Sequence, residues 1–174
     1  MSASHIVVGV DGSEQSKGAL RWASFMAEVT ASAIEAVAVW HVAPVWEGAG
    51  WTAMAPDWDP SADAEKMLAA TVDEVFGAAR PAGLTTVVRS GSAAKVLVEV
   101  SADARMLIVG SRGIGGFAGL RLGSVSAACT AHACCPVLVI HANTPPPPEP
   151  GPSALPAASQ GDDAGTTGRR RWTK

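Results

Sequence analysis

Apolar positions along the chain alternate between two kinds of pattern. Five short runs are rich in apolar and β-branched residues without polar alternation, at 4–10, 33–42, 84–89, 106–109 and 136–141. Such runs are typical of parallel strands that are covered on both faces. Four segments with helical spacing lie between them, at about 14–31, 62–80, 94–104 and 124–133. The alternation predicts an α/β fold, with one parallel sheet and helices on both of its faces.

The first predicted helix has a recognisable start and one defined face. Asp11 and Gly12 form a turn after the first strand, and Ser13 stands where a helix N-cap belongs. The residues that repeat at helical spacing on this segment are Ala19, Trp22, Ala23, Met26 and Thr30. We expect a helix over about 14–31 with these residues on one face.

Residues 43–61 contain three prolines and three tryptophans without any period, which predicts a long loop. A lid or a partner surface is one interpretation of Trp46, Trp51 and Trp58. The favoured interpretation is that they fold back over apolar surface, because exposed tryptophan is costly.

The composition changes at residue 143. Four consecutive prolines at 145–148 favour an extended, stiff segment, and the residues after them offer little apolar surface to bury. The sequence therefore predicts a folded domain over residues 1–142 and a proline-rich, disordered tail over residues 143–174.

A glycine-rich loop between a strand and a helix start is the chief candidate for chemistry, within residues 107–126. Backbone amides at a helix start lack intrahelical partners and favour anions, and glycines let the backbone approach a phosphate closely. The chain contains no G-x-x-x-x-G-K-[ST] motif, which excludes a P-loop. The turn after the first strand lacks the G-x-G-x-x-G spacing, which disfavours a dinucleotide.

In a parallel sheet the ligand lies beyond the carboxyl ends of the strands, where the winding reverses. Asp11 ends the first strand and Gly110 ends the fourth. We therefore expect both residues to belong to one site.

Composition and charge narrow the class of protein. The chain has 174 residues, of which 48% are hydrophobic and 17% charged, and its formal net charge is −3. No apolar run reaches the roughly 20 residues of a membrane helix, and the negative charge disfavours a nucleic-acid binder. The first residues carry no basic region of a secretory signal, so a cytoplasmic protein is expected.

The chain has three cysteines, Cys129, Cys134 and Cys135. The favoured interpretation is that all three are reduced thiols packed in the protein, and the alternative is that Cys134 and Cys135 form a redox or metal-binding pair.

These motifs together resemble the universal stress protein family over residues 4–142. The resemblance is carried by IVVGVDGS at 6–13, by HV at 41–42, by the closing GSVS and CPVLVI, and by G-2x-G-9x-G-[ST]. The last motif is met by Gly110, Gly113, Gly123 and Ser124. The resemblance implies a Rossmann-like three-layer sandwich with a five-stranded parallel sheet of order 3-2-1-4-5, usually dimeric, and the ATP-binding branch of the family. The family commonly has Ala-Asp before the fourth strand, where this chain has Ala104 and Arg105.

The resemblance also implies how an adenine nucleotide would lie. Adenine would lie near Val42, and Asp11 would face the ribose or Mg²⁺ held by the phosphates. The cofactor-binding residues that it implies are Val10, Asp11, Gly12, Ser13, Val42, Gly110, Ser111, Arg112, Gly113, Gly123, Ser124, Val125 and Ser126. Physical chemistry agrees, because helix-start amides, the hydroxyls of Ser124 and Ser126, and the positive charge of Arg112 suit phosphate, and Arg121 would add another charge. The alternatives are a turn-forming role for Asp11 and a solvated loop charge for Arg112.

The expected function is that of a cytosolic ATP-binding stress-response protein that acts as a regulatory or binding module. No residue is evidently placed as a base for water, and His41 is interpreted as a packed strand end. A slow ATPase, a cyclic AMP sensor and a nucleotide-free interaction scaffold are the alternatives. The last strand, with Val137, Leu138, Val139 and Ile140, is apolar and expected at a sheet edge, which together with the resemblance predicts a homodimer through it.

Overall fold

The protein, represented here by a computed structural model that describes residues 4–41, 59–113 and 122–148, folds around one parallel sheet. Its strands are β1 (His5–Gly9), β2 (Ala33–Trp40), β3 (Leu84–Ser90), β4 (Met106–Gly110) and β5 (Val137–Ile140). They lie in the order β3-β2-β1-β4-β5, and every neighbouring pair is parallel. The predicted α/β architecture and strand order are confirmed.

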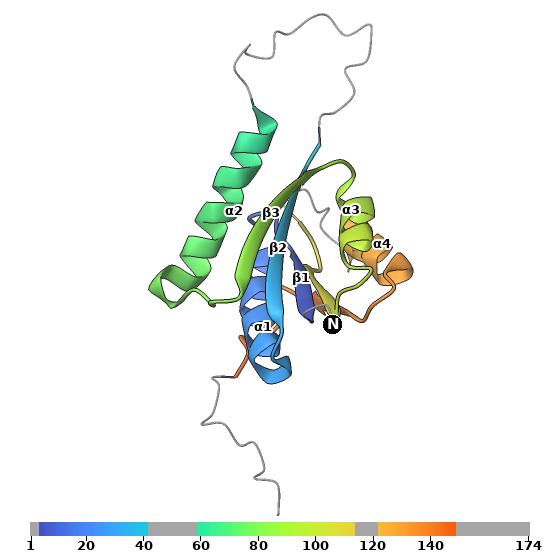
Figure 1. Ribbon diagram of the computed structural model, residues 1–174. Coiled ribbons are helices and arrows are strands. Elements are labelled where there is room, and N and C mark those ends of the chain that lie inside the picture. Colours follow the sequence, from blue (N-terminus) through green and yellow to red (C-terminus); the bar gives the residue numbers. More distant parts are fainter. Residues whose placement is uncertain (1–3, 42–58, 114–121, 149–174) are drawn as a thin grey trace, which may run out of the picture.

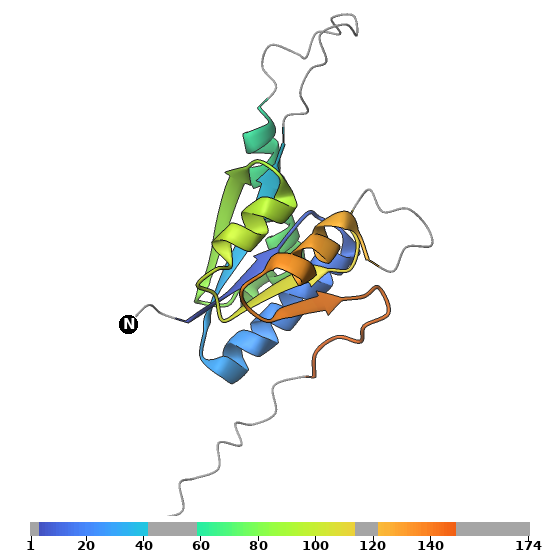
Figure 2. The same ribbon diagram turned by 90° about the vertical axis from the view of Figure 1, so that its right-hand side faces the viewer.

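Among the residues that the structure describes, four helices cover the sheet, two on each face (Figure 1). They are α1 (Glu14–Thr30), α2 (Pro60–Phe76), α3 (Ala93–Val100) and α4 (Ser124–His132), and a 3₁₀ turn, η1 (Gly77–Ala79), follows α2. Helices α1 and α2 lie on one face, and α3 and α4 lie on the other (Figures 1 and 2). The structure is therefore the three-layer sandwich expected from the sequence.

Alternate strand residues build two separate cores. Ile6 and Val8 point into the core under α1 and α2, whereas Val7 points into the core under α3 and α4. All three are fully buried. Burial on both faces is the physical reason why the strands read as continuous apolar runs, and each such side chain contributes about 1.5–3 kcal/mol.

The ends of several elements differ from the sequence expectation. Helix α2 begins at Pro60 because the Asp59 carboxylate accepts hydrogen bonds from the amides of Ser61 and Ala62, at 2.9 and 3.2 Å. The last residues of the predicted loop 43–61 thus belong to a helix. The tryptophans of that loop lie outside the described residues, so the interpretation of this segment stays a prediction.

The buried face of α1 is only partly the predicted one. Ala19 and Ala23 are buried, but Trp22, Met26 and Thr30 are half-buried at the margin. The residues of α1 that the sheet buries are Ser16, Ala19, Leu20, Ala23 and Ala27. Small side chains dominate this face because α1 lies close to the sheet, so that a Cβ at Gly110 would be only 2.7 Å from the Cβ of Gln15.

No helix within the described parts of the chain has the length and apolar character needed to cross a membrane.

Candidate functional site

The sheet reverses its winding between β1 and β4, which lie side by side. Val8 pairs with Ile108, so the two strands end at the same edge of the sheet. The chain leaves β1 toward α1, and it leaves β4 into the glycine loop. Val10 prolongs β1 by donating its amide to the carbonyl of Val37 at 2.9 Å and is 4% exposed. The predicted pairing of Asp11 with the start of the glycine loop therefore has a structural basis.

Asp11 forms a tight turn at this edge. Its Oδ1 accepts hydrogen bonds from the amide of Ser13 at 3.1 Å and from the Ser13 hydroxyl at 2.6 Å. Gly12 between them has φ +81°, a conformation that favours glycine. This is the turn-forming role considered for Asp11, but the other carboxylate oxygen, Oδ2, lies against Gly113. The same side chain thus holds the turn and faces the glycine loop.

The start of α1 is built on the same turn. The Ser13 hydroxyl donates to Asp11 and accepts the amide of Ser16 at 3.2 Å, which confirms Ser13 as the N-cap. The carbonyl of Ser13 accepts the amide of Lys17 at 3.0 Å and the Ser16 hydroxyl at 2.9 Å. Asp11 is consequently connected to the first turn of α1 through one serine.

Packing within the protein requires two glycines of the motif. A Cβ at Gly110 would lie 2.7 Å from the Cβ of Gln15 and 3.2 Å from the amide nitrogen of Ser16. A Cβ at Gly113 would overlap Oδ2 of Asp11. The third glycine, Gly123, has ordinary room, because its nearest neighbours would be 3.5 Å away. The first two glycines therefore let the loop backbone contact the start of α1 and the Asp11 turn.

Buried serines fasten the two ends of the glycine loop. The amide of Ser111 donates to the carbonyl of Ile140 at 2.7 Å, and its carbonyl accepts the amide of Gly123 at 2.7 Å. The Ser126 hydroxyl donates to the carbonyl of Gly110 at 2.6 Å, and Ser126 is 3% exposed. In this arrangement the Ser126 hydroxyl proton is directed to the loop backbone, so the side chain acts as a positioning group. The sequence offered no signal for this link between α4 and β4.

Further backbone N–H donors lie at the start of α4. Ser124 is exposed and Val125 is half-buried, and both lie in the first turn, where amides lack intrahelical partners. Arg112 is half-buried in the loop beside Gly113. The residues predicted for adenine and for extra charge, Val42 and Arg121, lie outside the described residues.

The end of β2 lies at the same edge of the sheet but differs from the expectation in one respect. The strand ends at Trp40, whose carbonyl accepts the amide of Gly91 at 2.9 Å. His41 is exposed, so its interpretation as a packed strand end is wrong. Its side chain is left at the surface because the strand has already ended.

Ion pairs of one lysine of α1 connect α1 to α2. The Lys17 ammonium lies 2.7 Å from carboxylate oxygens of both Glu14 and Glu74. Hydrogen bonds to these two carboxylates raise the pKa of Lys17, and the hydrogen bond from Lys17 lowers the pKa of Glu14. The pairs are exposed on the carboxylate side, so they fix the geometry of the two helices more than they stabilise the fold.

The three cysteines occupy different environments. Cys129 is buried, and burial raises the pKa of its thiol. Cys135 is half-buried and packs on the same core, whereas Cys134 is exposed, so the prediction that Cys134 is packed is wrong.

Within the described residues, no group of three or more His, Cys, Asp or Glu side chains could hold a metal ion.

Comparison with known structures finds the same fold in nucleotide complexes. A universal stress protein in complex with cAMP aligns with a TM-score of 0.58 at 24% identity, over 81% of this chain and 98% of that one. A universal stress protein from Archaeoglobus fulgidus in complex with dAMP aligns with a TM-score of 0.58 at 21% identity, over 80% and 99%. At these identities the likeness concerns the fold alone.

Sequence comparison is more specific. A universal stress protein from Mycolicibacterium smegmatis is 32% identical over 145 residues, which cover 78% of this chain and 47% of that protein. A universal stress protein from Mycobacterium tuberculosis is 35% identical over 139 residues, with the same coverage of 78% and 47%. The chain thus spans about half the length of the curated relatives it matches. The model of the universal stress protein family matches residues 3–141, and the chain belongs to that family.

Proposed function

We propose that this chain binds ATP with Mg²⁺ beyond the carboxyl ends of the central strands β1 and β4. We propose further that it acts as a nucleotide-dependent binding module. One observation carries the proposal. The glycine-loop backbone at Gly113 lies in contact with the Asp11 carboxylate, at the reversal point of the sheet. The first turn of α4 lies beside the same loop, because the amide of Gly123 donates a hydrogen bond to the carbonyl of Ser111. Backbone N–H donors of the glycine loop and of α4 therefore lie close to the Asp11 carboxylate.

Family relatives support an adenine nucleotide as the ligand. The solved structures with this fold that hold cAMP and dAMP share an adenine base and a phosphate in their ligands. Both features suit a site with helix-start amides and a glycine loop. The chain itself contributes the intact glycine motif at Gly110, Gly113 and Gly123.

The position of Asp11 favours ATP over cyclic AMP. A carboxylate oxygen beside the phosphate-binding backbone would repel a phosphate directly, and a divalent cation between the two removes that repulsion. Mg²⁺ is commonly held by one or two carboxylates together with substrate phosphates and water, which fits a site to which Asp11 contributes a carboxylate. Bound Mg²⁺ would supply charge neutralisation for the phosphates.

The roles that we propose for the other residues follow from their contacts. The backbone of 110–113 would lie along one side of the phosphates, and Gly123, Ser124 and Val125 along the other. Val10, Gly12 and Ser13 hold Asp11 in place, and Ser126 holds the carbonyl of Gly110. Val42 would adjoin the adenine, as the family resemblance implies.

Calorimetry on nucleotide-stripped protein tests this proposal. ATP with Mg²⁺ should bind, and chelation of Mg²⁺ should weaken binding in the native protein but hardly at all in Asp11→Asn. Asp103→Asn is the matched control, because Asp103 is exposed in the turn before β4, at the opposite edge of the sheet. Absence of ATP binding to the folded protein would refute the proposal, and tighter binding of cyclic AMP would refute the choice of ATP.

Phosphate release in the same samples decides between a binding module and a slow ATPase. We expect no release above that of Asp11→Ala. Sustained release by the native protein, lost in that variant, would make the chain an enzyme.

We also propose that the chain forms a homodimer through β5. This strand lies at one edge of the sheet, and its Val137, Leu138 and Val139 are only half-buried. An apolar edge strand can pair with a second copy. Light scattering at micromolar concentration should give the mass of a dimer, and the mass of a monomer would contradict this proposal.

A further inference from the structure

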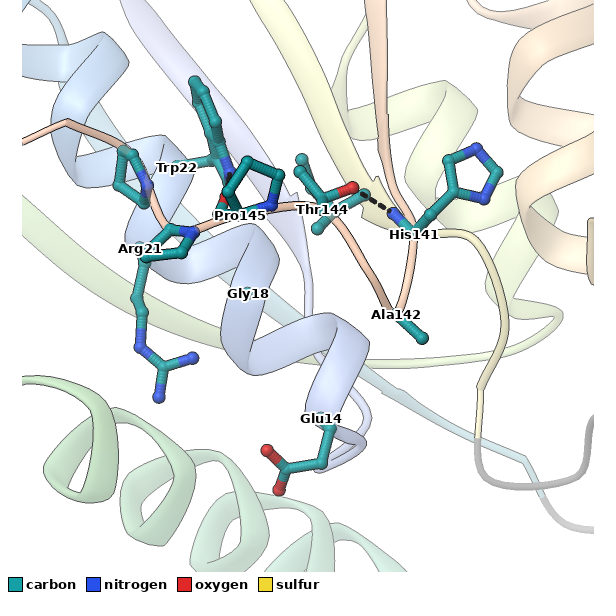
Figure 3. A pocket seen from close by; sticks show the side chains of 11 residues that line it. Glu14, Gly18, Arg21, Trp22, His141, Ala142, Thr144 and Pro145 are labelled. Atoms are coloured by element: carbon teal, nitrogen blue, oxygen red, sulfur yellow. Dashed lines mark hydrogen bonds between the residues drawn. The ribbon is translucent and has the colours of Figure 1, made fainter.

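After β5 the chain turns sharply and crosses the outer side of α1 (Figure 3). The amide of His141 donates to the Thr144 hydroxyl at 3.0 Å, and the amide of Thr144 donates to the carbonyl of His141 at 3.0 Å. These two bonds close a turn that directs residues 144–148, here called the proline strap, onto the helix. The start of the predicted tail is therefore attached to the domain.

One tryptophan of α1 holds the strap. The indole Nε1 of Trp22 donates to the carbonyl of Pro145 at 3.1 Å, across 123 residues of sequence. Phe25 contacts the Trp22 ring edge to face, with ring centroids 5.8 Å apart and an interplanar angle of 85°. Prolines have no N–H, and a polyproline II helix makes no internal hydrogen bonds, so its carbonyls are open acceptors for a donor such as indole.

The burial of the strap follows the period of polyproline II. Thr144 and Pro147 are half-buried, whereas Pro145, Pro146 and Pro148 are exposed. A polyproline II helix has three residues per turn, so residues 144 and 147 lie on the same edge. The edge with Thr144 and Pro147 is therefore the most buried of the three.

The outer side of α1 forms a groove under the strap. A pocket of about 340 Å³ lies between the two, lined on the helix side by Glu14, Gly18, Arg21 and Trp22. Gly18 allows the close approach of β5 to α1, because a Cβ there would lie 3.1 Å from Cγ2 of Ile140, the last residue of β5. The chain therefore leaves β5 close to α1, and Trp22 lies one turn after Gly18 on the helix.

We propose that the groove around Gly18, Arg21 and Trp22 is a polyproline-binding site, and that its occupant is this chain's own proline strap. Four consecutive prolines are already extended, so the strap loses little conformational freedom when it binds. Its attachment to β5 keeps its effective concentration high, so a single hydrogen bond and a short contact suffice to hold it. Aromatic grooves that bind polyproline segments use the same chemistry.

The indole N–H resonance of Trp22 in the full chain tests the proposal without using a nucleotide. Trp22→Phe assigns this resonance. Replacing all four prolines 145–148 by alanine keeps the carbonyls but removes the preformed helix, and it should shift the Trp22 signal and speed its solvent exchange severalfold. Pro152→Ala with Pro156→Ala is the matched control, because it removes prolines that lie outside the strap in the sequence, and it should leave the signal unchanged.

A capped peptide of residues 143–148 tests the groove separately. Added to the four-alanine variant, it should return the Trp22 resonance toward its native position, and the native chain should bind it at least roughly tenfold more weakly because the strap competes. A Trp22 signal that is the same in native and four-alanine chains, or that does not respond to the peptide, would overturn the proposal. A native signal that changes on dilution would also overturn it, since the occupant would then be the strap of a second copy.

Discussion

A methyl group at position 113 tests how the glycine loop is held against the Asp11 turn. In Gly113→Ala the new Cβ would overlap Oδ2 of Asp11, whose Oδ1 is held by the amide and the hydroxyl of Ser13. Gly113 is not among the described glycines with positive φ, so alanine can adopt its backbone conformation. The strain comes from the contact, and it is relieved only when Asp11 turns away or the loop shifts.

The size of the effect follows from the hydrogen bonds at risk. A hydrogen bond to an ionised acceptor contributes about 1.5–3 kcal/mol, and Asp11 would lose one of its two bonds to Ser13. Alanine offsets about 0.4–1 kcal/mol of this by restricting the unfolded chain. The free energy of unfolding should therefore fall by about 1–2 kcal/mol, and ATP affinity should fall by about tenfold or more because both walls of the site move.

Urea unfolding of Gly113→Ala, Asp11→Ala and the double variant separates this contact from other causes. Without the Asp11 carboxylate the methyl group has room, so Gly113→Ala should then cost about 1 kcal/mol less than it does in the native background. Gly83→Ala is the control, because its Cβ would be 3.5 Å from the nearest atom, and it should change stability by less than about 0.5 kcal/mol. An equal cost of Gly113→Ala in both backgrounds would refute the reasoning.

Four further results are expected. Gly123→Ala should leave the free energy of unfolding within about 0.5 kcal/mol, since its Cβ has room, yet weaken ATP binding measured by calorimetry; unchanged binding would show that no ligand approaches that backbone. Ser126→Ala should lower the free energy of unfolding by about 1–3 kcal/mol in urea, because the partly buried carbonyl of Gly110 loses its donor, and a neutral result would contradict that role. A thiol reagent should modify exposed Cys134 in the folded protein and reach Cys129 only after unfolding. Burial raises the pKa of the Cys129 thiol. The contribution of Cys129 to the free energy of unfolding should therefore be complete below the ordinary thiol pKa and should decline as the pH rises through the pKa of the folded state. Unfolding curves of Cys129→Val should lack this pH dependence.

Local patterns explain which parts of the fold could be predicted. The five strands read as apolar runs because residues such as Val7 and Val8 are buried on opposite faces of the sheet. Ser13 was recognisable as an N-cap because the cap and its partner, the amide of Ser16, are three residues apart. Such features depend on neighbouring residues, so their signal is present in the sequence.

The errors have an equally physical origin. On α1 two overlapping stripes of residues, one with Trp22 and one with Leu20, have the same helical period. Only the close approach of α1 to the sheet decides that Leu20 is fully buried and Trp22 lies at the margin. Similarly, nothing near His41 indicates that β2 ends one residue before it.

By itself the sequence determined the α/β class, the succession of strands and helices, and the place of the glycine loop at the end of β4. These follow from periodicity and turn chemistry within short stretches. Only the tertiary structure decided that Gly113 touches Asp11, that Ser126 fastens the carbonyl of Gly110, and that Trp22 holds the strap through Pro145. Each of these contacts joins a side chain to the backbone of another element, and the two meet only because the fold brings the strand ends and the helices together.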